Sequence, residues 1–317
     1  MGRNTNPAGL FATPEALKLN WAMAVENYEK RYLRYCHTIA ELSAFYKTHG
    51  ITTVQLKGVG LSTYYPIPSH REGGRYRHLH LFGQTIPRKS DAEANRLADR
   101  LMEEKGIEVD FEHSEKHSMF YYKGIPIENH KTFINSETYR IAVKMDKLLQ
   151  KLLQPVSAEL DGKCSILIPS STFNTVISRF SCRPALCTRL ALHHLCDWAC
   201  LLNRYDLHIP EEVTDIRFRN MILAMTRLCN DYLGTSVPVY GGEELAEEIL
   251  REIIRPPYTM SVPAKNKWGI LVYKTKRMLH THRACNSVLR ISLCKWVGNS
   301  ILLHLRSPHT IFQTERK

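Results

Sequence analysis

Residues 55–62 read Gln55-Leu56-Lys57-Gly58-Val59-Gly60-Leu61-Ser62 and join a predicted strand to a predicted helix. The uncharged run from Ile51 to Leu56 predicts a buried strand, because β-branched and aliphatic residues dominate it. Lys57-Gly58 then predicts an exit turn, since glycine adopts backbone angles that other residues avoid. The residues after the turn predict a short helix, so backbone N–H groups at the turn are placed to meet phosphate oxygens.

A second informative stretch follows a Tyr-Pro turn at residues 64–68. It reads Arg71-Glu72-Gly73-Gly74-Arg75-Tyr76-Arg77-His78-Leu79-His80-Leu81. A later strand closes at Ile127-Glu128-Asn129-His130. Taken together, these segments resemble the bacterial family of uncharacterised nucleotidyltransferases, distant relatives of the DNA polymerase β superfamily. In that family, a Leu-Lys-Gly strand end leads through a short helix and a Tyr-Pro turn to Arg-x-x-Gly-Asp-x-Asp.

The resemblance implies an α+β fold class, with a polymerase-β-like core of a small mixed sheet and flanking helices, followed by a helical C-terminal region. It implies Mg²⁺-dependent transfer of a nucleoside monophosphate from a nucleoside triphosphate to an acceptor hydroxyl. The two Asp side chains of the motif lie two apart on one strand, so they point to the same face and share the metal. It also assigns phosphate binding to Lys57, Gly58, Arg71, Gly73 and Gly74.

Neither Asp of the motif stands at its expected place in this chain. Counting from Arg71 puts Arg75 and Arg77 there, and a guanidinium cannot ligate a cation. An insertion of three residues would instead put His78 and His80 there, although imidazole suits zinc or nickel better than magnesium. Both alignments stay open, and neither restores a conventional site for two metal ions.

A shift of reading frame is a third interpretation of residues 75–82. Codons compatible with this stretch, read one base later, give Asp-Ile-Asp-Ile-Tyr-Thr. The same exercise on residues 180–187 gives Ser-Leu-Ala-Gly-Gln-His-Phe-Ala, which is more typical of a helix than the residues present. We therefore hypothesise that one or both segments are frame-shifted relative to an active ancestor, through gene decay or sequence error.

Glu128 ends the strand that is expected beside the motif strand. In the resembling family an acid here is the third carboxylate, so Glu128 is the candidate catalytic residue, as metal ligand or as base. Lys116-His117 and His130 are candidates to line the same cleft, and His130 and Asp197 are candidates for the acceptor site. Asp197 lies in the string 193–200, whose apolar spacing favours a packed helix over a zinc site.

The pattern along the chain divides it into four regions. They are N-terminal helices at 1–50, a nucleotidyltransferase-like core at 51–135, a helical domain with a β-hairpin at 136–255, and a linker with a basic amphipathic tail at 256–317. Within the core we expect Gln55–Lys57, Leu79–Phe82 and Ile125–Glu128 to be strands of one sheet. The hairpin is predicted around Asp161-Gly162.

Composition indicates a globular protein of the cytoplasm. The chain has 317 residues, of which 44% are hydrophobic, enough for a sizeable core. Its nine cysteines are scattered and no secretory leader precedes them, which favours reduced thiols. No run approaches the about 18 apolar residues of a membrane-spanning helix, so we expect no transmembrane segment.

The net charge of +12 is concentrated at the end of the chain. From Lys265 to Lys317 there are eleven Lys and Arg against the single acid Glu315, a net charge of +10. Such a tail suits RNA, an anionic membrane surface or an acidic partner, although solvated helix faces also have this composition. We expect its apolar residues between Val288 and Leu305 to dock on the helical domain.

Three functional hypotheses remain after the sequence alone. The first is a nucleotidyltransferase whose activity is impaired by loss of the Asp-x-Asp ligands, with Mg²⁺ as cofactor, a nucleoside triphosphate as substrate and an acceptor that the sequence does not identify. The second is a non-catalytic nucleotide- or phosphate-binding pseudoenzyme. The third is an adaptor that binds RNA or a membrane surface through the basic tail.

Overall fold

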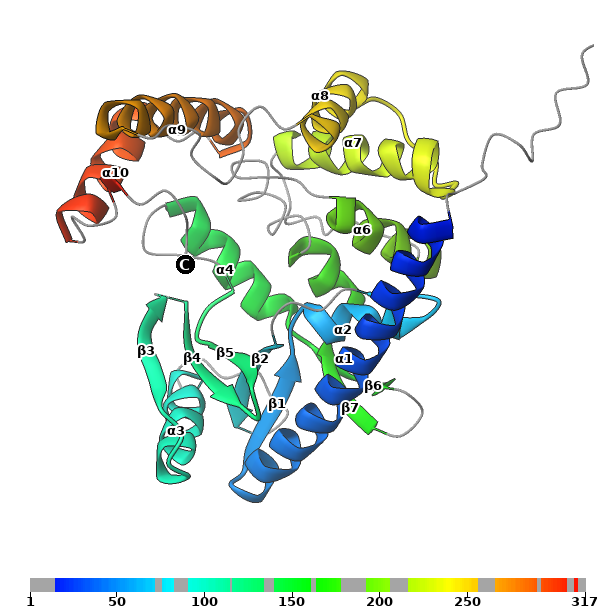
Figure 1. The fold of residues 1–317 in the computed structure, drawn as a ribbon, viewed down its shortest axis with the longest axis vertical. Coiled ribbons are helices and arrows are strands. Elements are labelled where there is room, and N and C mark those ends of the chain that lie inside the picture. The colour runs from blue at the N-terminus through cyan, green and yellow to red at the C-terminus, as the bar shows by residue number, and fades with distance from the viewer. Residues whose placement is uncertain are drawn as a thin grey trace, which may run out of the picture. The chain divides into compact units, whose positions relative to one another are not determined.

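The computed structural model describes residues 15–71, 76–82, 91–114, 116–133, 140–160, 164–177, 192–205, 216–255, 266–289, 292–306 and 311–312. The chain divides into two compact units, whose elements are labelled in Figure 1. The first consists of Met1–Lys131 and Pro155–Ile168, and the second of Thr132–Gln154 and Pro169–Lys317. The chain therefore leaves the first unit after Lys131, enters the second unit, and returns to the first unit for residues 155–168.

Helix α1 (Glu15–Thr48) forms one wall of the core of the first unit. Its buried side chains recur every three or four residues, as one helical face requires: they are Tyr32, Tyr35, Cys36, Ile39, Leu42 and Tyr46. The helix is followed by Gly50, whose φ of 73° favours glycine. Trp21, nearer the start of the helix, is 62% exposed, so the burial begins later in the helix.

The described residues of the first unit form a mixed seven-stranded sheet. Its strands are β1 (Ile51–Gln55), β2 (Tyr76–Phe82), β3 (Val109–Ser114), β4 (His117–Tyr122), β5 (Ile125–His130), β6 (Pro155–Leu160) and β7 (Cys164–Pro169). Their order across the sheet is β3-β4-β5-β2-β1-β7-β6. β2 is antiparallel to β1 and parallel to β5, while β7 is parallel to β1. This mixed sheet with its helices is compatible with the predicted α+β class.

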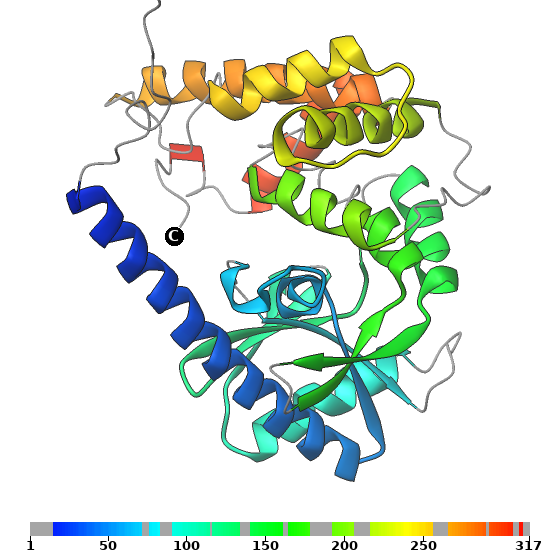
Figure 2. The same cartoon turned by 90° about the vertical axis from the view of Figure 1, so that its right-hand side faces the viewer.

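Helices α1 and α3 (Asp91–Glu104) pack on the same face of this sheet (Figure 2). The ring of Tyr46 in α1 lies 4.3 Å from that of His80 in β2. On α3, Asp99 accepts a hydrogen bond of 2.7 Å from Asn129. Asn129 is the register partner of His78, which points to the same face as His80. The opposite face of β2 and β5 carries Arg77 and Glu128.

The three segments that were predicted to share one sheet do share it. β2 contains Leu79–Phe82 and β5 contains Ile125–Glu128, while β1 ends at Gln55, so Leu56 and Lys57 follow the strand. The residues from Leu79 to Phe82 are thus not the irregular loop that a structurally broken site would give. The strands of the predicted hairpin are also present as β6 and β7, and its turn at Asp161-Gly162 lies outside the described residues.

The second unit is helical in its described part. Its helices include α4 (Arg140–Leu152), α6 (Leu192–Arg204), α7 (Ile216–Leu233), α8 (Glu243–Ile254), α9 (Lys267–Leu289) and α10 (Leu293–Arg306). The fully buried Trp198 of α6 donates its indole N–H to Thr226 of α7 at 3.2 Å. Among the described helices, none combines the length and apolarity needed to cross a membrane.

The face of the sheet beneath α1 buries an unusual number of polar side chains. His78 and His80 are fully buried, with ring centroids 4.3 Å apart. Thr53 contacts His80 Nδ1 at 3.3 Å, but the buried side-chain amide of Gln55 has no hydrogen-bond partner among the described residues. Burial lowers the pKa of His80 to about 3 and, with the nearby His80 and His130, lowers the pKa of His78 well below its usual value.

We expect stability to fall on acidification because of these two histidines. Below the unfolded pKa of about 6.5, the unfolded chain binds protons that buried His78 and His80 do not, so the free energy of unfolding decreases as pH falls. From pH 6.5 to pH 5 the loss should be about 2 kcal/mol for each histidine. Urea unfolding followed by circular dichroism at several pH values measures it.

The matched comparison uses a His78→Leu/His80→Leu variant and a His193→Gln control, since His193 is exposed on α6. The double variant should show a flatter dependence on pH, and the control should keep the slope of the parent chain. Equal slopes for all three proteins would refute the assignment.

Candidate functional site

The turn between β1 and α2 (Gly58–Ser62) has an unusual backbone. Lys57 has a φ of 50° and Gly58 a φ of 42°, so a non-glycine residue adopts the left-handed region beside a glycine. Such backbone conformations cost about 1–3 kcal/mol and concentrate at ligand-binding positions. Gly60 lets the helix approach the strand, because a Cβ there would lie 2.7 Å from the carbonyl oxygen of Gln55.

Arg71 lies at a small cavity between α1 and α2. The cavity is also lined by Tyr28, Arg31, Tyr32, Tyr35, Gly58, Val59 and Ser62. Its volume of about 10 Å³ holds no more than one water molecule, so a phosphate group would enter only after side chains move outward. The sequence did not predict Arg31, whose only signal is that it shares a helical face with Tyr28 and Tyr35.

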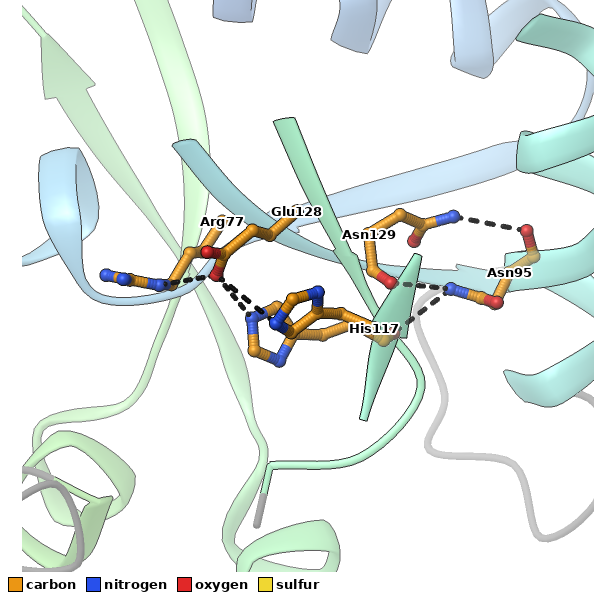
Figure 3. A network of polar contacts seen from close by, with 6 residues as sticks. Arg77, Asn95, His117, Glu128 and Asn129 are labelled. Carbon is orange, nitrogen blue, oxygen red and sulfur yellow. Dashed lines mark hydrogen bonds and ion pairs between the residues drawn. The ribbon is translucent and has the colours of Figure 1, made fainter. Parts of the chain in front are cut away.

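The strand pairing brings Arg77 against Glu128. The two residues are register partners on the parallel strands β2 and β5, and Arg77 Nε donates to Glu128 Oε2 at 2.8 Å (Figure 3). Glu128 is 2% exposed, and a buried carboxylate needs such a partner because its charge is costly to remove from water. A guanidinium therefore lies beside the acid that the sequence marked as catalytic.

Two imidazoles complete the surroundings of this carboxylate. His130 Nε2 on β5 is 3.4 Å from Glu128 Oε2, and His117 Nε2 on β4 is 3.9 Å from the same oxygen (Figure 3). His117 and His130 are register partners on antiparallel strands, so they project to the face that holds Glu128. Both histidines thus lie close to Glu128, and their role in lining a cleft with Lys116 stays a prediction.

His78 and His80 lie on the other side of the sheet. Side chains alternate along a strand, so the residue of β2 that faces Glu128 is Arg77, and its neighbour His78 points beneath α1. A cation held by Glu128 cannot be shared with His78 or His80. Of the two alignments that the sequence left open, the geometry favours the one that places Arg75 and Arg77 at the two Asp positions of the motif.

The donors present do not fit Mg²⁺. This ion takes oxygen ligands in nearly octahedral geometry, whereas the described part of the site offers the single carboxylate of Glu128, and the guanidinium of Arg77 occupies one of its oxygens. No group of three or more potential metal-ligating side chains is found in the residues that the structure describes. We therefore derive no step through a metal ion.

A hydrogen-bond network that the sequence did not reveal holds β4 and β5 against α3. Asp99 accepts bonds of 2.8 and 2.9 Å from Ser118 and one of 2.7 Å from Asn129. Asn95 Nδ2 donates to the backbone oxygens of Asn129 and His130, and Asn129 donates in return to the backbone oxygen of Asn95 (Figure 3). Burial raises the pKa of Asp99, and the bonds from Asn129 and Ser118 oppose that shift. The network fixes the strand that presents Glu128.

The remaining candidates of the sequence lie elsewhere. Gly73, Gly74 and Arg75 fall outside the described residues, as does the segment 180–187. Asp197 is buried in α6 of the second unit. His130 belongs to the first unit, and the shared role of the two residues in acceptor binding stays a prediction.

Comparison with known proteins identifies a family for the middle of the chain. Residues 90–234 match the family described as uncharacterised nucleotidyltransferase. This match confirms the nucleotidyltransferase resemblance drawn from the sequence. It includes Glu128, His130 and Asp197 and begins after Lys57, Arg71 and Arg77. No significant match was found among curated proteins or solved structures.

Arg77 and the buried Glu128 should behave as a coupled pair. Arg77→Ala leaves the carboxylate without its guanidinium and should lower the free energy of unfolding by about 3 kcal/mol. The same change in a Glu128→Gln background should cost less, since no buried charge is then stranded. Urea unfolding of the two single variants and the double variant measures the difference.

The control for this cycle is Lys123→Ala, which removes an exposed ion pair with Glu41. It should cost less than about 1 kcal/mol. Additive effects of Arg77→Ala and Glu128→Gln would contradict a coupled pair.

Proposed function

We propose that this nucleotidyltransferase-like protein binds a nucleoside triphosphate through its phosphates and does not transfer the nucleotide. The fold we propose for its first unit is a polymerase-β-like core, in which β1, the turn at Lys57, α2 and β2 correspond to the strand, helix and motif strand of the family. The chemistry of that family is attack of an acceptor hydroxyl on the α-phosphorus, with pyrophosphate as leaving group. It depends on carboxylates that hold Mg²⁺.

The observation that carries the proposal is the 2.8 Å contact of Arg77 with Glu128. At a position where the family alignment expects an acid, the chain has a fixed positive charge. A guanidinium neutralises the buried carboxylate, as a bound cation would, but it is not a Lewis acid, so it cannot lower the pKa of an attacking hydroxyl as a bound metal ion does. The pair preserves charge balance in the site while it removes the donor set for the metal.

Phosphate binding is proposed for Lys57, Gly58 and Arg71, together with Arg31. The left-handed backbone at Lys57 and Gly58 supports a ligand-binding turn, and Arg31 and Arg71 line one cavity beside Gly58. Because α2 has only five residues, the side-chain charges must supply most of the attraction. Phosphate oxygens match the planar donor pattern of arginine.

Binding of ATP should not require Mg²⁺. Isothermal titration calorimetry of the full chain should give dissociation constants within about twofold of each other in Mg²⁺ and in EDTA. Lys57→Ala and Arg71→Ala should each weaken binding about tenfold or more, since each removes a charged hydrogen bond worth about 1.5–3 kcal/mol.

Lys30→Ala is the matched control, because Lys30 is an exposed cation of α1 beside Arg31 in sequence and pairs with Glu26. It should leave the affinity unchanged. An absence of ATP binding, or equal losses in the control and in Arg71→Ala, would refute phosphate binding at this turn.

Transfer activity should be missing from the parent chain. With α-labelled ATP and Mg²⁺, labelling should be at least about 100-fold below that of an Arg75→Asp/Arg77→Asp variant, because even outer-shell changes at metal sites cost about 10- to 100-fold. Adding Glu128→Gln to that variant should abolish the gain. Strong Mg²⁺-dependent labelling by the parent chain that is lost on Glu128→Gln would show that a metal site exists in spite of Arg77.

A further inference from the structure

Helix α9 has a strip of exposed apolar side chains along one side. Trp268, Leu271, Val272 and Leu279 are all exposed, and Trp268 is 77% exposed. Their spacing of three, one and seven residues places them on one side of the helix. Large apolar side chains scattered singly are normal on a surface, but four on one helical face form a contiguous strip that calls for a partner.

The other side of the same helix is packed within its own unit. Ile270 of α9 is buried, and His280 Nε2 lies 3.4 Å from Glu252 of α8. On the side of the strip, His282 follows Leu279 and is buried, and its ring lies 6.0 Å from that of Trp296 in α10, so the exposed strip ends before it. The helix is therefore packed through the face of Ile270 and His280, and the strip from Trp268 to Leu279 remains exposed.

The next helix also exposes its apolar residues. In α10, the exposed side chains include Leu293, Ile301, Leu302 and Leu305, of which Leu305 is 69% exposed. The expectation that the tail residues dock on the helical domain is wrong for these positions. In α9, by contrast, the inner face with the buried Ile270 does pack within the second unit.

Positive charge surrounds the strip on α9. Lys267 and Lys276 are exposed, and at about 100° per residue they lie on its two flanks. The region from Lys265 to Lys317 has eleven basic residues and one acid. Lysines in such flanks can extend their ammonium groups toward anionic headgroups while their stems cover apolar surface.

We propose that α9 and α10 lie on an anionic lipid surface, with the strip of α9 inserted between headgroups. The combination of Trp and aliphatic residues on one face with basic residues at the edges is the pattern of helices that lie in the membrane interface. Phosphates of RNA would satisfy the lysines but would leave Leu271, Val272 and Leu279 without apolar contacts. An anionic lipid surface satisfies both the lysines and the apolar residues, because charge attraction and apolar insertion act together.

The proposal is tested by co-sedimentation of the full chain with vesicles. We expect binding to vesicles of phosphatidylcholine with 30–40% phosphatidylglycerol (about one-third anionic lipid, as polybasic attraction requires) and little binding to phosphatidylcholine alone. Trp268→Ser/Leu279→Ser should weaken binding at least about tenfold, and Lys267→Glu/Lys276→Glu should do the same while also reducing the dependence on salt.

The matched control is Leu19→Ser/Trp21→Ser, which removes one leucine and one tryptophan of similar exposure from α1. It should bind as the parent chain does. Melting curves establish whether each variant is folded. If one of the two α9 variants does not fold, the other still tests the proposal. No binding to anionic vesicles, equal losses in the control, or binding to RNA with none to vesicles would overturn the proposal.

Discussion

The parallel pairing of β2 with β5 is the constraint on which the first unit depends. It puts Arg77 opposite Glu128 and thereby decides which side chains of β2 face the site and which enter the core. Since the carboxylate is almost completely buried, its charge has to be balanced by groups that the sheet itself supplies. Arg77 provides this balance from one neighbouring strand and the imidazoles of His117 and His130 add polar contacts from the same sheet face. The α3 network around Asp99 holds the same strands from the other side.

The sequence predicted the strands of this sheet because local patterns determine them. The uncharged run before Lys57 and the residues around Asp161-Gly162 signal their own ends through turn chemistry. The local pattern did not determine which side chains of β2 face the site, since a shift of one residue in register exchanges the faces of Arg77 and His78. Spacing along the chain therefore left two alignments open until the pairing with Glu128 chose between them.

Arg31 and Asp99 were missed for a related reason. Each gains its importance from residues distant in sequence: Arg31 lines one cavity with Gly58, and Asp99 accepts hydrogen bonds from Ser118 and Asn129. Nothing in the neighbouring residues distinguishes them from exposed helix positions.

The polar groups beneath α1 also bear on the hypothesis of a frame shift, because the shifted reading would place Ile where His78 is buried. An aliphatic residue there would fill the core without the desolvation that depresses the pKa of the imidazole.

The return of the chain to the first unit has a consequence for synthesis on the ribosome. β1 is complete at Gln55, but its neighbour β7 begins only at Cys164, and Val54 pairs with Leu167. Until those residues emerge, the nascent chain carries an open edge in the middle of its future sheet, which is a template for pairing with other chains. Fragments that stop before residue 155 retain that open edge permanently. Expression of the amino-terminal part alone should for this reason yield aggregates, and chaperone capture should concentrate on the interval between the two strands.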